Sequence, residues 1–219
     1  MVIKSNESVT VEWYYDKVTD MEISSLFKFV KPYLKDKRVL DLGCGTGRYL
    51  EFFSKDSIGI DASYESIKIV KKKGLNIKFG DLNQKLNFHN DFFDIVFCSH
   101  ILEHVESPIG LLKECNRILK KNGLIFIILP NETNLPNLIG LDNYFGNHPE
   151  HLYSFSIKNT KILLSNANFN IMNVFIAVYL IKRFMYKSHL GNLFLNFVQK
   201  MPRFIIYPFS DEYMIIGKK

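Results

Sequence analysis

Short apolar runs alternate along the chain with segments whose apolar residues recur every three or four positions. The runs predict buried strands, at Arg38–Leu42, Ser57–Asp61, Leu75–Phe79, Phe92–Cys98 and Leu124–Leu129. The periodic segments predict helices, at Arg48–Lys55, Tyr64–Lys73 and Pro108–Lys120. Regular alternation of this kind is typical of an α/β fold, with a parallel sheet and helices on both of its faces. Ligands of such sheets bind at the carboxyl ends of the strands.

The two ends of the chain add less regular elements. Asp20 is suited to cap a helix, which Pro32 would kink and whose apolar face carries Ile23, Leu26, Phe27, Val30 and Leu34. Residues 130–153 are rich in Asn, Pro and Gly and predict a long loop. A helix over 156–166 and strands over 169–180 and 212–216 complete the predicted elements.

An insertion, Lys182–Pro208, separates the last two predicted strands. It contains an apolar stripe at helical spacing, formed by Leu190, Leu193, Phe194, Phe197, Val198 and Met201. Most of the net charge of +6 lies nearby, because residues 181–219 hold seven Lys or Arg against two Asp or Glu. A basic amphipathic helix favours peripheral contact with a membrane surface and a lipid-linked acceptor. Packing on the core, or on a second copy in a homodimer, fits the stripe as well.

Composition narrows the class of protein. The chain has 219 residues, of which 47% are hydrophobic and 23% charged, and this suits a single folded domain. No apolar run is long enough to cross a membrane, and Met1–Thr10 lacks the apolar core of a signal peptide. The three cysteines are scattered without metal-type spacing. We therefore expect a reduced, cytoplasmic protein.

The segment Val39–Gly47 reads V-L-D-L-G-C-G-T-G, a buried strand that runs into a glycine loop. Glycine allows sharp turns and close approach to a ligand, and the free N–H groups beyond the strand suit an anionic group. The spacing is G-x-G-x-G, and Asp41 precedes it. A carboxylate at that position repels a pyrophosphate but attracts an ammonium group. The cofactor is thus predicted to carry an amine and a carboxylate rather than a diphosphate.

Two further acids follow the next predicted strands. Asp61 ends the second strand and is suited to accept both ribose hydroxyls of a nucleoside; capping the next helix is the alternative, although Ser63 can do that alone. Asp81 follows the third strand after Gly80. It is suited to accept from an adenine amino group, or else it is a simple turn residue.

Taken together, these segments resemble the class I S-adenosylmethionine-dependent methyltransferases, in particular the branch that methylates small molecules, quinones and sugars. The resemblance covers roughly 37–168 and rests on Val39–Gly47, Gly59-Ile60-Asp61, Gly80-Asp81-Leu82, Phe93–Ser99, Leu102-Glu103-His104-Val105 and Asn116–Lys120. It implies a Rossmann-like, seven-stranded, mostly parallel sheet whose last strand is antiparallel. The apolar stripe described above adds a helical insertion before that strand. The resemblance also implies one domain, with an N-terminal helical cap (1–36), a cofactor-binding core (37–180), a substrate-cap, membrane or dimer insertion (181–210) and the last strand (211–219).

The resemblance also assigns the cofactor, S-adenosyl-L-methionine. Residues at the positions of Asp41, Gly43 and Gly45 line its methionine part, Asp61 holds the ribose, Asp81 and Leu82 hold the adenine, and Ser99 lies near the sulfonium. Residues before the first strand close over the cofactor in this family, which makes Tyr15 or its neighbour Tyr14 a candidate. The predicted cofactor site comprises Tyr15, Asp41, Gly43, Cys44, Gly45, Gly47, Asp61, Ala62, Asp81, Leu82 and Ser99.

Methyl transfer to a hydroxyl gains from a general base, and histidine is the natural choice near neutral pH. His151 stands at the end of the predicted long loop, beside the expected acceptor site, in H-P-E-H-L-Y. We take it as the first catalytic candidate, the alternative being that it bonds backbone and holds the loop. His104 is the second candidate.

His100, Glu103 and His104 would share one face of a helix and could then bind zinc or another divalent ion. The pattern H-x-x-E-H also occurs in inverted zinc peptidases, but here it follows a buried strand inside a cofactor domain, which excludes that interpretation. Some quinone methyltransferases are similar here, with Glu at the position of His100, and use a divalent metal. A fourth or open ligand position cannot be identified, so no metal is predicted; Glu103 and His104 would then cap and pack the following turn.

The leading hypothesis is a methyltransferase that O-methylates a small molecule, a glycan or a lipid-linked intermediate. A catalytically silent, cofactor-binding partner subunit is one alternative, motivated by the apolar insertion. An RNA methyltransferase is the other, motivated by the basic C-terminal segment. The last is disfavoured, because Cys98-Ser99-His100 stands where amino-methylating enzymes of nucleic acids carry an Asn/Asp-Pro-Pro-Tyr motif.

Overall fold

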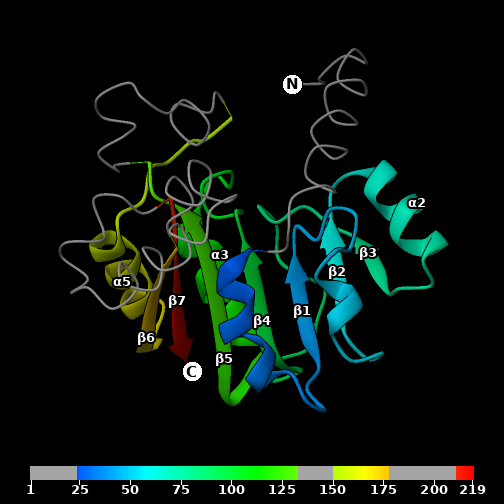
Figure 1. Cartoon of the computed structure of the whole chain (residues 1–219), viewed down its shortest axis with the longest axis horizontal. Coiled ribbons are helices and arrows are strands. Elements are labelled where there is room, and N and C mark those ends of the chain that lie inside the picture. Colours follow the sequence, from blue (N-terminus) through cyan, green and yellow to red (C-terminus); the bar gives the residue numbers. More distant parts are fainter. Residues whose placement is uncertain (1–23, 133–149, 178–210) are drawn as a thin grey trace, which may run out of the picture.

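A seven-stranded sheet runs through the middle of the molecule, in the order β3-β2-β1-β4-β5-β7-β6 (Figure 1). The computed structural model describes residues 24–132, 150–177 and 211–219. The strands are β1 (Val39–Leu42), β2 (Ile58–Asp61), β3 (Ile77–Phe79), β4 (Phe93–Ser99), β5 (Leu119–Pro130), β6 (Asn170–Ala177) and β7 (Glu212–Lys218). β1 to β5 pair in parallel, whereas β7 lies between β5 and β6 and is antiparallel to both. The predicted fold class, with an antiparallel last strand, is confirmed.

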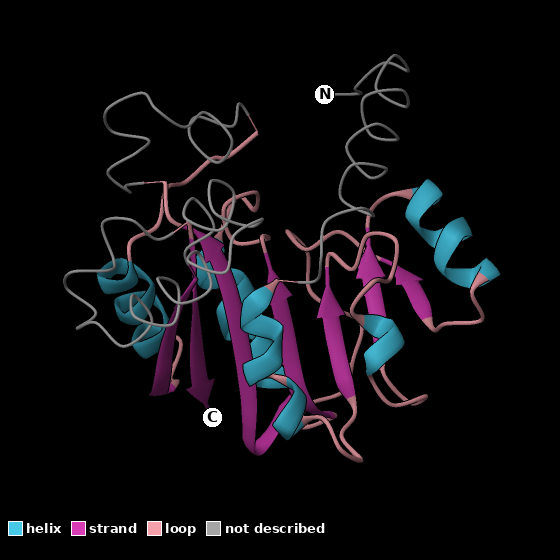
Figure 2. Cartoon of the chain, viewed as in Figure 1, coloured by secondary structure: helices cyan, strands magenta, loops and turns pink. Residues whose placement is uncertain are grey.

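In the residues that the structure describes, three α-helices and three short 3₁₀-helices connect and cover the strands (Figure 2). They are α2 (Tyr64–Lys72), α3 (Pro108–Ile118), α5 (Ile157–Asn166), η1 (Ser25–Phe29), η2 (Lys31–Tyr33) and η3 (Leu50–Phe52). Each α-helix begins at a serine N-cap whose hydroxyl accepts a backbone N–H three residues on; the caps are Ser63, Ser107 and Ser156. The predictions for these three helices are confirmed to within two residues.

The central strands are buried on both faces, as their uninterrupted apolar runs predict. Successive side chains of a strand point to opposite faces. On β4, Ile95 and Phe97 pack with the η1 and η2 side chains, whereas Val96 and Cys98 pack with those of α3. η1 and η2 therefore cover one face of the sheet and α3 the other (Figure 1).

Two segments predicted as α-helices form short 3₁₀ turns instead. The segment predicted as a helix over Arg48–Lys55 holds only the single turn η3. Adjacent side chains of this segment pack in different clusters. Tyr49 packs with the η1 side chains, whereas Leu50 packs against Cys44 and Val70. The helix predicted from Asp20 is, over its described part, the two 3₁₀ turns η1 and η2. Pro32 stands in the first turn of η2, where its missing N–H costs nothing.

Smaller differences concern strand ends and the segment after β4. β5 begins at Leu119, earlier than predicted, and Asn122 adopts the left-handed backbone (φ 65°) that an Asn-Gly turn favours. Residues 100–104 form a turn rather than a helix, with His100 at φ 54°. Tyr14, Tyr15, most of the 130–153 loop and the 182–208 insertion lie outside the described residues. Within the described residues, no helix is long and apolar enough to span a membrane.

Candidate active site

The carboxyl ends of β1, β2, β4 and β5 meet at one edge of the sheet, where their arrowheads point in Figure 1. The glycine loop follows β1 at this edge. Gly43, Gly45 and Gly47 all have left-handed backbone, with φ of 62°, 51° and 77°. A Cβ on Gly43 would lie 1.9 Å from Ile101 Cδ1, so a larger residue there would meet both strain and a clash.

Asp61, at the end of β2, holds this loop in place. Its Oδ2 accepts the Gly45 N–H at 2.8 Å, and its Oδ1 accepts the Ser63 N–H at 2.8 Å. Ser63, not Asp61, is the N-cap of α2. The Asp61 side chain therefore links the glycine loop to the start of α2, and each oxygen keeps a lone pair for a further donor.

Asp41, inside β1, is a deeply buried acid at this edge. It is 2% exposed, and its Oδ2 has no hydrogen-bond partner. Burial raises its pKa well above the usual value, and the nearby charge of Asp61 raises it further, against a smaller lowering by Arg48. A buried carboxylate oxygen without a donor costs about 1–3 kcal/mol, which a donating ligand would recover.

Ser99 ends β4 and contacts the hydroxyl of Tyr49, which also bonds the backbone of Ser24. Burial raises the Tyr49 pKa, so the phenol is a neutral donor at this edge. Tyr49 was not among the predicted site residues. The only local signal was its position two residues after Gly47. An aromatic residue at that position is equally typical of the core, so the contact with Ser99 became evident only in the folded structure.

His100 lies between two buried acids, Glu103 and Glu212, which are far apart in the sequence. Its Nε2 lies 3.1 Å from Glu212 Oε2, at the start of β7, and its Nδ1 lies 3.6 Å from Glu103 Oε1. Glu212 also accepts a hydrogen bond from the Ser24 hydroxyl. Burial alone would lower the pKa of His100, but bonds and charges from the two glutamates outweigh it and raise the pKa to about 10.

The two predicted catalytic histidines lie side by side. The His104 and His151 rings are 4.7 Å apart between centroids and nearly perpendicular. The Nδ1 of His151 contacts the carboxylate of Glu132, which follows β5, and the Nδ1 of His104 lies 3.2 Å from the Glu150 carbonyl. Glu103 is 1% exposed, and its backbone carbonyl accepts the N–H of Leu152 at 2.7 Å. The turn after β4 is thereby fastened to the segment before α5.

The predicted adenine residues lie on a segment that follows β3. Asp81 is exposed, and its Oδ1 accepts the Asn83 N–H at 2.9 Å, as in a turn. Leu82 packs partly on the core, and Ala62 is exposed beside Asp61.

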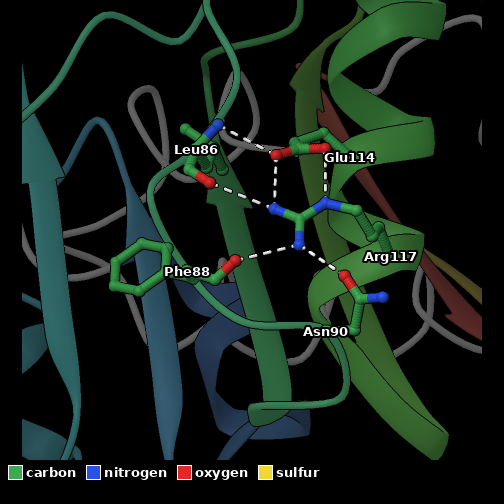
Figure 3. Close-up of polar contacts among 5 residues, drawn as sticks. All are labelled: Leu86, Phe88, Asn90, Glu114 and Arg117. Carbon is green, nitrogen blue, oxygen red and sulfur yellow. Dashed lines mark hydrogen bonds and ion pairs between the residues drawn. The ribbon is translucent and has the colours of Figure 1, made fainter.

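Arg117 of α3 secures the continuation of this segment (Figure 3). Its guanidinium bonds the carbonyls of Leu86 and Phe88, the side chain of Asn90 and both oxygens of Glu114. All five of its donors are therefore used within the fold.

Comparison with known sequences decides the family. The sequence model described as "Methyltransferase domain" matches residues 18–174, well over half of the chain. The chain belongs to this methyltransferase family.

Individual relatives agree with this. An uncharacterised protein of Methanocaldococcus jannaschii is 33% identical over 165 residues, covering 74% of this chain and 71% of that protein. A ubiquinone biosynthesis O-methyltransferase of Histophilus somni is 31% identical over 113 residues, covering 46% of this chain and 48% of that protein. The chain spans about half the length of several of the curated relatives that it matches.

A solved structure supports both the fold and the cofactor. A SAM-dependent methyltransferase of Archaeoglobus fulgidus has a TM-score of 0.66 and 28% identity, over 89% of this chain and 91% of that chain. S-adenosylmethionine is thus the cofactor of this methyltransferase. The residues present fit it, because the unpartnered, buried Asp41 oxygen suits its ammonium group and both Asp61 oxygens keep lone pairs for its ribose hydroxyls.

Proposed function

We propose that this methyltransferase O-methylates a small-molecule or lipid-linked acceptor that binds above β4 and β5. The observation that carries the proposal is the pair His104–His151, backed by Glu132, at the edge of the sheet that also bears the cofactor loop. The name of the ubiquinone relatives, which are O-methyltransferases, supports an oxygen nucleophile. A neutral or weakly acidic hydroxyl is the acceptor that gains most from such a base.

In this proposal, S-adenosylmethionine lies along the carboxyl ends of the strands, with its methionine part at β1. Asp41 takes the ammonium group, and the loop of Gly43, Cys44, Gly45 and Gly47 takes the rest of the methionine part. Asp61 and Ala62 meet the ribose, Asp81 and Leu82 meet the adenine, and Ser99 lies next to the sulfonium. The Asp61 geometry supports this order, since its oxygens are already aligned by two backbone N–H groups and keep lone pairs for ribose hydroxyls.

In the proposed reaction, an oxygen lone pair of the acceptor forms a bond to the methyl carbon, in line with the carbon–sulfur bond. That bond breaks, its electrons pass to sulfur, and the sulfonium becomes a neutral thioether. His151 takes the hydroxyl proton, and Glu132 holds the imidazole in one tautomer and stabilises its charge. His104 lies against the same ring. Orientation and exclusion of water supply the rest of the rate.

The test uses a cell extract as the source of acceptors and a cofactor with an isotopically labelled methyl group. We expect the label to appear in a small molecule as a base-stable ether, found by mass spectrometry. His151→Ala should lower the rate about 100-fold or more while the affinity for the cofactor stays the same. His89→Ala, an exposed histidine away from this edge, is the matched control and should change neither.

The other outcomes are informative. Label recovered only in RNA, or no label with any acceptor despite cofactor binding, would overturn the proposal in favour of an RNA enzyme or a silent subunit. An unchanged turnover rate of the His151→Ala variant would show that His151 is not the general base.

A further inference from the structure

Three charged side chains meet at the carboxyl end of β4 and take no part in the reaction proposed above. His100 Nε2 lies 3.1 Å from Glu212 Oε2, and His100 Nδ1 lies 3.6 Å from Glu103 Oε1. Both acids are buried, Glu212 at 3% and Glu103 at 1% exposed. Glu212 reaches this edge because β7 runs antiparallel to β5 and begins beside its end, paired with Pro130 (Figure 1). We call the three residues the Glu212–His100–Glu103 cluster.

The cluster carries a net negative charge at neutral pH. Burial alone would lower the pKa of His100, but hydrogen bonds and charges from the two glutamates outweigh it and raise the pKa to about 10. His100 is therefore an imidazolium at neutral pH, and it forms ion pairs with both carboxylates. Its single positive charge balances only one of the two negative charges, so one negative charge remains within the cluster.

Backbone and side-chain contacts hold these charges in fixed positions. His100 has left-handed backbone, with φ of 54°, and its N–H donates to the Ile128 carbonyl at 2.9 Å. A residue other than glycine keeps this conformation only where its surroundings enforce it, and such residues are concentrated at functional sites. Glu212 is held as well, because the Ser24 hydroxyl donates to its carboxylate. Charges fixed in this way act on a ligand without having to reorganise.

The charge of Glu212 acts at the strand end that carries Ser99. The Tyr49 hydroxyl contacts Ser99 and bonds the backbone of Ser24, the residue whose side chain binds Glu212. Burial raises the pKa of the Tyr49 phenol most, the charge of Arg48 lowers it, and the charge of Glu212 raises it. The negative charge of Glu212 is therefore felt at the hydroxyl that contacts Ser99.

Methyl transfer changes the charge of the cofactor at one atom. The sulfur of S-adenosylmethionine is a sulfonium cation, whereas that of the product, S-adenosylhomocysteine, is a neutral thioether. A negative charge fixed near that atom attracts the cation, and the attraction is stronger where water is excluded. The two ligands share every other charged group, so this attraction is measured by the ratio of their affinities.

We propose that the Glu212–His100–Glu103 cluster makes the cofactor site discriminate between the methyl donor and its product, with Glu212 as the specificity-determining residue. Its negative charge favours S-adenosylmethionine over S-adenosylhomocysteine, and His100 limits this preference because it offsets part of the charge. The inference rests on one part of the proposed function, the position of the sulfonium next to Ser99. With this charge in place, the product competes less well with the methyl donor than it would without the charge.

The test is calorimetric titration of the full chain with each of the two ligands at pH 7, where His100 is charged. The quantity compared is the dissociation constant of S-adenosylhomocysteine divided by that of S-adenosylmethionine. Glu212→Gln keeps the size of the side chain and removes its charge, so it should lower this ratio about threefold or more. Glu103→Gln should lower the ratio as well. His100→Gln removes the cation of the cluster and should leave the ratio equal or higher.

Glu114→Gln is the matched control. It also removes a partly buried carboxylate that is paired with a cation, Arg117, but it lies on α3, outside the cluster. It should leave the ratio within twofold. A purely structural role of the cluster would change both dissociation constants by the same factor, so the ratio separates an electrostatic role from a structural one.

Two results would overturn the inference. One is an unchanged ratio in a folded Glu212→Gln protein, and the other is a lower ratio in His100→Gln. Binding of S-adenosylmethionine shows that a variant is folded. Should Glu212→Gln fail to fold, Glu103→Gln decides in its place, and an unchanged ratio there has the same meaning. None of these results bears on the proposed O-methylation, because the labelling experiment tests that through the acceptor.

Discussion

At the scale of single residues, the cofactor edge is defined by two acids with different surroundings. Asp61 has both oxygens bonded to backbone N–H groups, whereas Asp41 is buried with an unpartnered oxygen. The charge of Asp61 adds to the cost of ionising Asp41. The pair therefore favours a ligand that presents hydroxyls to one acid and a cation to the other, and disfavours a pyrophosphate.

Asp61→Ala should raise the dissociation constant for S-adenosylmethionine at least tenfold. The change removes the proposed ribose acceptor and frees the Gly45 N–H, so the glycine loop loses its anchor. Isothermal titration calorimetry measures the affinity, and circular dichroism checks the fold. Glu65→Ala, an exposed acid in the first turn of α2, should bind as the parent does. An Asp61→Ala protein that is folded and binds normally would contradict the assignment.

At the scale of elements, polar contacts fasten loops to the faces of the sheet. Arg117 and Glu114 of α3 together make four hydrogen bonds to the segment between β3 and β4 (Figure 3). Three are to backbone, at Leu86 twice and at Phe88, and the fourth is to the Asn90 side chain. Asp94, near the start of β4, accepts the Arg38 N–H that precedes β1 and the ammonium group of Lys120 in β5. Burial of apolar side chains stabilises the sheet, and these polar contacts fix the positions of the segments that begin or end its strands.

Arg117→Ala should lower the free energy of unfolding by about 2–4 kcal/mol, since it removes the cation paired with Glu114 and leaves the carbonyls of Leu86 and Phe88 without the donor that they have in the fold. Urea denaturation measures the change. Adding Glu114→Ala should cost much less than it costs alone, because the two side chains act as one unit. Strictly additive losses would show that they act separately.

Asp94→Asn should destabilise the protein in a pH-dependent way. Burial raises the pKa of Asp94, but bonds from Lys120 and the Arg38 N–H outweigh it and lower the folded-state pKa below 3.8. A lowered carboxyl pKa stabilises the fold above the unfolded pKa, and that stability is lost as the pH falls through the folded one.

The stability difference between parent and Asp94→Asn should therefore be constant above about pH 5 and shrink below 3.8. Urea unfolding at pH 7 and pH 3 tests this, with the exposed Asp56→Asn as control. A difference that persists unchanged at pH 3 would refute the electrostatic origin.

At the scale of the whole molecule, the fold places the candidate cofactor and acceptor residues at one end of the parallel strands. The loops after β1, β2 and β3 carry the cofactor candidates, and those after β4 and β5 carry the acceptor candidates. Parallel pairing of these five strands is what brings loops distant in sequence to the same edge.

S-adenosylhomocysteine, the thioether product of methyl transfer, should stabilise the whole domain. At about 100 times its dissociation constant it adds about 2.7 kcal/mol, which corresponds to a rise in melting temperature of about 5–10 °C for a domain of this size. NAD⁺ at the same concentration should give no shift, because its pyrophosphate would face Asp41. Differential scanning fluorimetry compares the two, and an equal shift with NAD⁺ would contradict the cofactor assignment.

The order of strands and helices through residues 38–129 could be predicted from the sequence. Their apolar runs and serine caps are local signals, and burial on both faces of a parallel sheet requires such runs. The glycine loop was predictable too, because left-handed backbone at Gly43, Gly45 and Gly47 needs glycine. The antiparallel last strand was predictable only through family resemblance, since no local pattern encodes the direction of pairing.

The sequence by itself determined the seven strands and three α-helices that the structure describes, the glycine loop and the acids at the ends of β1, β2 and β3. Only the tertiary structure decided which side chains meet. It set His100 against Glu212, 112 residues away, and His151 beside His104 and Glu103. Helical spacing grouped His100 with Glu103 and His104, but residues 100–104 turn instead, with His100 in left-handed backbone. Contacts between distant strand ends depend on strand order and loop path, and no periodicity within one segment carries that information.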